Sequence, residues 1–88
     1  MNDLKLQEDL KKLRREVREI AAGDDEAREH LDLLISDIER RIQMPSDANR
    51  HKNLLQSIKD AIGKFESEHP RATGILNDIM TTLANMGI

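Results

Sequence analysis

The 88 residues of the chain can form one small domain at most, and the formal net charge of −3 argues against a strong general affinity for nucleic acid. Charged residues make up 35% of the chain and hydrophobic residues 38%, a composition typical of helical bundles and coiled coils. The absence of cysteine excludes disulfides and thiol chemistry, and the lack of a long apolar run excludes a membrane span. Since the N-terminus has no apolar signal sequence, we expect residues 1–88 to form a single cytoplasmic helical domain.

The first predicted helix covers residues 3–22, with Asn2 or Asp3 as its cap and Gly23 as the residue that ends it. Its hydrophobic residues follow the alternating spacing of four and three that defines a heptad seam: Leu6, Leu10, Leu13, Val17 and Ile20. A basic stripe runs along another side of this helix and consists of Lys11, Arg14, Arg15 and Arg18. Because a heptad seam is narrow, we expect this helix to pack lengthwise against another one.

The second predicted helix covers residues 25–43, with Asp24 or Asp25 as its cap and an acidic first turn that suits the positive end of the helix dipole. Its seam contains Ala27, Leu31, then Leu34 or Ile35, Ile38 and Ile42. The link to the first helix is so short that the two helices should form an antiparallel hairpin. The basic stripe would then face the acidic start of the second helix or of a partner's.

Residues 44–47 break the pattern, since Pro45 cannot continue a helix and Ser46 or Asp47 can start a new one. The third predicted helix covers residues 47–66 and has a seam of His51, Leu55, Ile58, Ile62 and Phe65. The fourth covers residues 70–86 and has a seam of Ala72, Leu76, Ile79, Leu83 and Met86. The similar lengths of the segments favour an all-α bundle of four short amphipathic helices that run alternately up and down.

The connection at His69-Pro70 leaves two architectures open. Pro70 has no N–H group and disfavours helical geometry at His69, so that one helix can end here and another can start. The seam nevertheless continues in phase from Phe65 to Ala72, as it would along one helix that is kinked at the proline. We therefore expect either two antiparallel helices or a single kinked helix.

Two stretches resemble those of a family of short bacterial proteins: Phe65-Glu66-x-Glu68-His69-Pro70 and Leu83-Ala84-Asn85-Met86-Gly87-Ile88. That family combines a leucine-rich, charged first half with a Phe-Glu-x-x-His-Pro turn and a Met-Gly-Ile end, and it is catalogued as a domain of unknown function. The resemblance implies a bacterial, intracellular, all-helical protein. It brings no activity, cofactor or catalytic residue.

Few residues suggest chemistry. Glu66 and His69 would share one face of a continuous helix and could bind a metal ion, but further ligands would have to come from a second copy. Glu26 with His30 is expected to be a solvated pair, and His51 a partly buried, hydrogen-bonded histidine. No serine lies in a nucleophile motif and no glycine-rich phosphate loop exists, so we expect neither an enzyme nor a cofactor. Acidic neighbours and the lack of stacking aromatics favour solvation or pairing of the basic stripe over nucleic-acid binding.

We therefore expect a non-catalytic structural or interaction module that forms a homodimer or binds a helical protein partner, and that binds neither nucleic acid nor membrane. The seam residues expected to carry the packing are Leu10, Leu13, Val17, Leu31, Ile38, Ile58, Ile62, Phe65, Leu76, Ile79 and Leu83. The dimer is expected because apolar residues beside the seams would stay exposed in a monomer: Leu4, Leu33, Leu54, Ile75 and Met80. The alternatives are a metal-binding bundle that uses Glu66 and His69 across a dimer, and a weak nucleic-acid binder that uses the basic stripe.

Overall fold

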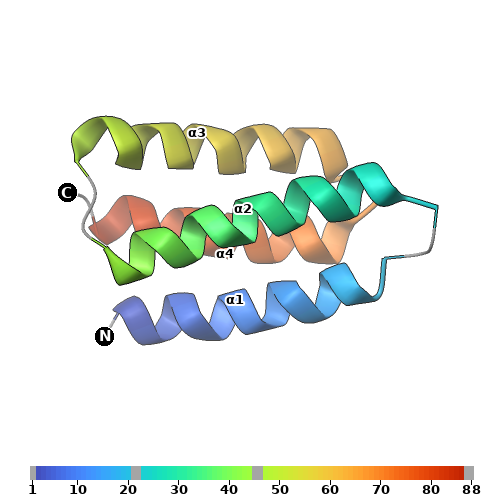
Figure 1. Ribbon diagram of the computed structural model, residues 1–88, viewed down its shortest axis with the longest axis horizontal. Coiled ribbons are helices and arrows are strands. Elements are labelled where there is room, and N and C mark those ends of the chain that lie inside the picture. The colour runs from blue at the N-terminus through green and yellow to red at the C-terminus, as the bar shows by residue number, and fades with distance from the viewer. Residues whose placement is uncertain (1, 21–22, 45–46, 87–88) are drawn as a thin grey trace.

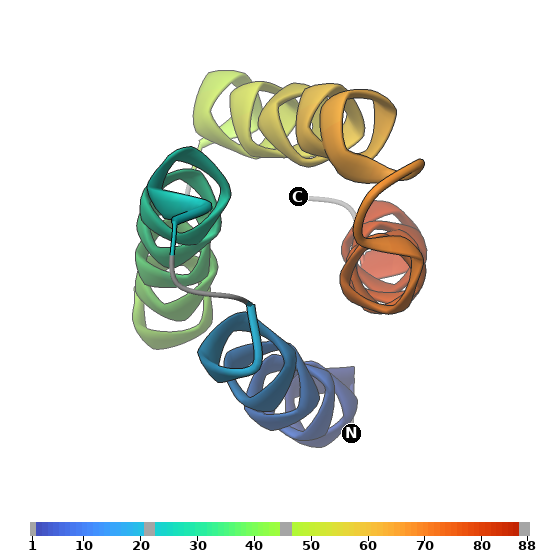
Figure 2. The ribbon, with the colours of Figure 1, turned by 90° about the vertical axis from the view of Figure 1, so that its right-hand side faces the viewer.

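The computed structural model describes residues 2–20, 23–44 and 47–86, and these residues form four α-helices (Figure 1). The helices are α1 (Asn2–Arg18), α2 (Asp25–Gln43), α3 (Ala48–Phe65) and α4 (Pro70–Met86). Each helix runs antiparallel to the one before it, and α4 packs against both α3 and α1, so that the helices form a closed ring when seen end-on (Figure 2). The prediction of an all-α bundle is confirmed.

The chain reverses between α3 and α4. The backbone N–H groups of Glu68 and His69 both donate to the carbonyl oxygen of Phe65, at 3.2 and 2.8 Å. These two hydrogen bonds close the end of α3. Pro70 is the first residue of α4, a position where its missing N–H group has no partner to lose. The two helices then lie side by side, so the structure contains the reversal and not the kinked helix.

Helix α1 ends at Arg18 and not at residue 22 as predicted. The N–H group of Glu19 is shared between the carbonyl oxygens of Arg15 and Glu16, and the N–H group of Ile20 donates to Val17 at 3.2 Å. These shorter bonds tighten the chain into a turn, which brings Ile20 into the core at 8% exposure. Gly23 follows with a φ of +108°, in the region that favours glycine, so it belongs to the link and not to the helix end.

The start and the end of the other helices lie within one residue of their predicted bounds. Asp47 caps α3, because its Oδ1 atom accepts a hydrogen bond from the N–H group of Arg50 at 2.8 Å. The alternative cap Ser46 lies outside the described residues, and so do the predicted capping side chains of Asn2 and Asp3. Asp24 precedes α2 at the cap position, but its side chain makes no capping hydrogen bond.

The core lies inside the ring of helices and is aliphatic. Its largest fully buried side chains are Leu6, Leu13, Leu31, Ile38, Ile58, Leu76, Ile79 and Leu83. Among the residues expected to carry the packing, Ile62 is partly buried and the others are buried. Within the described part of the chain, no helix is both long enough and apolar enough to cross a membrane.

The seams therefore face one another inside one chain. The apolar residues that were predicted to be exposed beside the seams are exposed only in part. Leu4 and Leu33 are exposed as expected, at 66% and 69%. Leu54 is buried, contrary to expectation, because it lies on the side of α3 that faces α2 and the core. Ile75 and Met80 are half-buried against the core.

Candidate functional site

Three potential metal ligands meet at the end of the bundle where the α1–α2 link and the α3–α4 turn lie. The Nε2 atom of His69 is 2.7 Å from Oδ2 of Asp24, and the Glu68 carboxylate lies beside this pair. One ligand atom from each of the three side chains lies within 4.8 Å of the others. Among the described residues this is the only cluster of three or more His, Cys, Asp or Glu residues at such spacing.

Local sequence explains why these residues meet. Gly23 turns the chain back and leaves Asp24 just ahead of α2. Pro70 keeps His69 ahead of α4 in the same way, since the residue before a proline avoids helical geometry. The two links lie at the same end of the bundle (Figure 1), so the side chains of Asp24 and His69 can bond across 45 residues of sequence.

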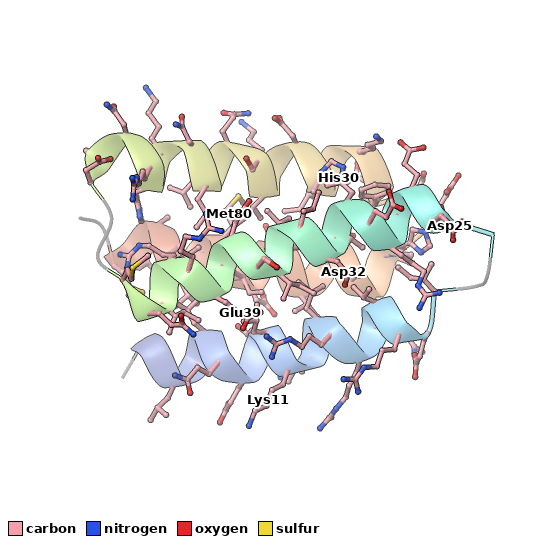
Figure 3. All side chains as sticks on the ribbon, in the orientation of Figure 1. Lys11, Asp25, His30, Asp32, Glu39 and Met80 are labelled. Carbon is pink, nitrogen blue, oxygen red and sulfur yellow. The ribbon has the colours of Figure 1, made fainter. Side chains whose placement is uncertain are left out.

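The ring of Phe65 packs against the ring of His69. Their ring centroids are 6.2 Å apart at an interplanar angle of 60°. The same phenylalanine meets the ring of His30 edge-on, at 5.3 Å and 81°, and Figure 3 shows His30 on the side of α2 that faces α3. Lys64 lies over the Phe65 ring and pairs with Glu26. His30 and Glu26 therefore have separate partners, on the side of α2 that faces α3.

The ligand pair suggested by the sequence differs from the one in the structure. Glu66 is exposed and lies outside the cluster, whereas Glu68 belongs to it. The i, i+3 relation of Glu66 and His69 holds only on a continuous helix, and α3 ends at Phe65. Asp24 is the predicted cap of α2, and the sequence pattern does not mark it as a ligand. The signal that could have found it is the up-down order of the helices, which puts the first and the third link at the same end of a bundle.

The basic stripe of α1 is partly engaged with α2. Arg14 forms an ion pair with Glu39, which Figure 3 shows on the side of α2 that faces α1. The groove beside this pair also contains Arg18, Arg28 and Asp32. Arg14 and Arg18 of the stripe therefore lie beside acidic groups of α2, whereas Lys11 is exposed on the side away from α2 (Figure 3). The acidic partner is Glu39 near the end of α2 and not the acidic first turn that the sequence suggested.

A more basic groove lies between α2 and α3, at the opposite end of α2 from Asp24. It has a volume of about 500 Å³, and its lining includes Arg40, Arg41 and Arg50, with Asp37 as the acidic member. His51 is buried nearby at 7% exposure, and its Nδ1 atom has no hydrogen-bond partner among the described residues. Burial, and to a smaller degree the charge of Arg41, lower the pKa of His51 below its ordinary value of 6.5.

An apolar groove runs between α3 and α4 and has a volume of about 390 Å³. Leu55, Met80 and Ala84 lie in it, and Lys52 and Lys59 lie along its α3 side. The outward surface of α4 beside the groove is exposed and mostly uncharged, with Asp78 as its charged residue beside Gly74, Asn77, Thr81 and Asn85. The groove and these four residues are called the α3–α4 face below.

These features define a small antiparallel four-helix bundle, within the described residues, that has a ligand cluster at one end and an apolar groove on one side. The chain belongs to a family described as Domain of unknown function (DUF4404), whose model matches residues 6–88. No curated protein and no solved structure matches the chain.

Proposed function

We propose that the protein is a non-catalytic interaction module that forms a homodimer through its α3–α4 face. The observation that carries the proposal is the scarcity of charge on α4, which contains Arg71 at its start and Asp78 as its charged residues. By contrast, most of the exposed residues of α1 are charged. Depletion of charged residues is the compositional mark of an interface core, so the outward surface of α4 is the best candidate for contact with another protein.

The seams themselves are not available for this contact. Leu76, Ile79 and Leu83 are fully buried inside the bundle, so a partner cannot reach them without opening it. Leu55, Ile62 and Met80 are instead half-buried at the α3–α4 groove or beside it, since Ile62 follows Leu55 by one heptad on the same side of α3. A second copy would complete the burial of these side chains.

The size and the charges of the face fit a second copy of the chain. Helix α4 has 17 residues and is therefore about 25 Å long. Two adjacent helices of about 10 Å diameter give roughly 500 Å² per copy, or roughly 1,000 Å² in total, which is the lower limit for a specific interface. In a twofold arrangement, Asp78 of one copy can approach Lys52 or Lys59 of the other. A dimer with micromolar affinity is consistent with an interface of this size.

Light scattering coupled to size-exclusion chromatography tests the proposal. The chain has a mass of 10.1 kDa, and we expect a mass of about twice that value at tens of micromolar. Thr81→Glu places a charge on the exposed α4 surface and should give the monomer mass with an unchanged helical circular dichroism spectrum. The matched control is Leu33→Glu on α2, which should remain dimeric although Leu33 is the most exposed large hydrophobic residue among those that the structure describes.

A wild-type chain that stays at the monomer mass as the concentration rises would contradict the homodimer. It would leave a different helical protein as the partner of the same face, for which Thr81→Glu is again the diagnostic variant. A dimer that Leu33→Glu breaks and Thr81→Glu does not would move the interface to α2.

The proposal includes a setting inside a bacterial cell, in the cytoplasm. Support comes from the resemblance carried by the Phe65-to-Pro70 turn and by the end of the chain, part of which lies outside the described residues. Nucleic acid is not the proposed ligand, because the net charge is negative and Arg14 of the basic stripe is paired with Glu39. Salt-dependent, submicromolar binding of duplex DNA would overturn this part.

A further inference from the structure

The strongest unassigned feature is the cluster of Asp24, Glu68 and His69. Two carboxylates and one imidazole are a donor set that Zn²⁺ and neighbouring divalent transition metals bind. Three protein ligands leave one tetrahedral position for water. The donors come from two links that are distant in sequence, so an ion here would join the α1–α2 link to the α3–α4 turn.

The geometry requires small side-chain movements to hold an ion. Ligand atoms about 2.0–2.1 Å from a tetrahedral Zn²⁺ are roughly 3.3–3.4 Å from one another. The Asp24 Oδ2 to His69 Nε2 distance of 2.7 Å would have to open by roughly 0.6 Å. The largest separation in the cluster is at most 4.8 Å, so the exposed Glu68 carboxylate would have to approach by no more than about 1.4 Å.

Two further observations favour an ion at this place. First, the His69 ring packs against Phe65, and the His69 side chain is only 18% exposed. Its Nε2 atom already points at Oδ2 of Asp24. Second, Glu68 and His69 line an open groove of about 340 Å³ together with Glu16 of α1, Glu19 just after it, and Arg71 as the basic residue. Its three carboxylates outnumber the one guanidinium, so the groove attracts cations, and it gives the ion a path from solvent.

We propose that Asp24, Glu68 and His69 form a binding site for one Zn²⁺-class divalent transition-metal ion per chain, with water as the remaining ligand. The ion holds the two links of one end together and so stabilises the folded bundle, since it binds the three donors only when they are assembled. This site is independent of the α3–α4 face, and it differs from a dimer-bridging Glu66–His69 site in both its acidic ligand and its stoichiometry.

Isothermal titration calorimetry, in which ZnCl₂ is added to the chelator-treated full-length protein, tests the site. We expect one ion per chain, and a loss of affinity of at least tenfold in His69→Gln and in Asp24→Asn. Glu68→Gln should also weaken binding, whereas the matched controls Glu66→Gln and His30→Gln should bind as the wild type does. In parallel, ZnCl₂ should raise the melting temperature of the wild type and of both controls, but not that of Asp24→Asn.

Several results would overturn the proposal. One ion per two chains, lost in Glu66→Gln and kept in Glu68→Gln, would assign the metal to a dimer-bridging pair. Wild-type affinity in His69→Gln, or a dissociation constant in the millimolar range for the wild type, would show surface binding without a defined site. Circular dichroism of each metal-free variant identifies any loss of affinity that comes from unfolding, and the melting shift of the remaining folded variants then decides the outcome.

Discussion

Replacement of Phe65 by alanine tests the packing at the end of the bundle that carries the ligand cluster. The side chain is 5% exposed and touches the rings of both His30 and His69. Loss of its burial costs about 2 kcal/mol, and the cavity left behind adds roughly 1–2 kcal/mol. We therefore expect Phe65→Ala to lower the free energy of unfolding by about 3–5 kcal/mol, with the upper end reached if the two ring contacts contribute separately.

This loss is large for a chain of 88 residues, whose total stability is about 4–13 kcal/mol at the usual value per residue. Urea denaturation followed by far-ultraviolet circular dichroism measures it directly. Phe65→Leu is the control that fills most of the cavity, and it should cost about 1–2 kcal/mol. A change under about 1 kcal/mol for Phe65→Ala would refute the burial of this ring and with it the support of His69.

Three further predictions concern α3. Asp47→Ala removes the cap that accepts the Arg50 N–H group and should cost about 1 kcal/mol in urea denaturation; an unchanged midpoint would show that the cap does not contribute. Gly63→Ala should stabilise by about 1 kcal/mol, because an added Cβ meets no atom within 4 Å, and a lower melting temperature would contradict this. The pKa of His51 is lowered below 6.5 by burial and then by Arg41, so the unfolded chain binds the extra proton first as the pH falls. Stability should therefore decrease below about pH 6.5, and a pH series in which His51→Gln shows the same slope as the wild type would refute the assignment.

Much of the fold follows from the sequence, because the signals that form helices are local. The spacing of four and three along Leu6 to Ile20, and again along Leu76 to Leu83, selects one side of each helix for burial. Pro70 and Asp47 mark the starts of α4 and α3 through groups within the same turn. Such signals act over three or four residues, and the bounds of α2, α3 and α4 accordingly lie within one residue of those predicted.

The end of α1 and the position of Leu54 needed the tertiary structure. Heptad spacing includes Ile20 in the first seam, but it cannot show that the chain tightens after Arg18 to bury that residue. Leu54 lies beside its seam in sequence, and its burial depends on α2 packing against that flank of α3. Both outcomes are set by neighbouring helices and not by the local spacing.

The cluster of Asp24, Glu68 and His69 also depends partly on local sequence and partly on how the helices pack. The sequence determined that His69 precedes a helix-starting proline and that Asp24 follows a glycine, since these are properties of adjacent residues. It did not determine that the two side chains meet, because they are 45 residues apart and a continuous helix would have paired His69 with Glu66. The reversal at residues 66–69 and the closure of the ring by α4 against α1 brought Asp24, Glu68 and His69 together. Only the packing of all the helices fixes that contact, because no local interaction spans the distance.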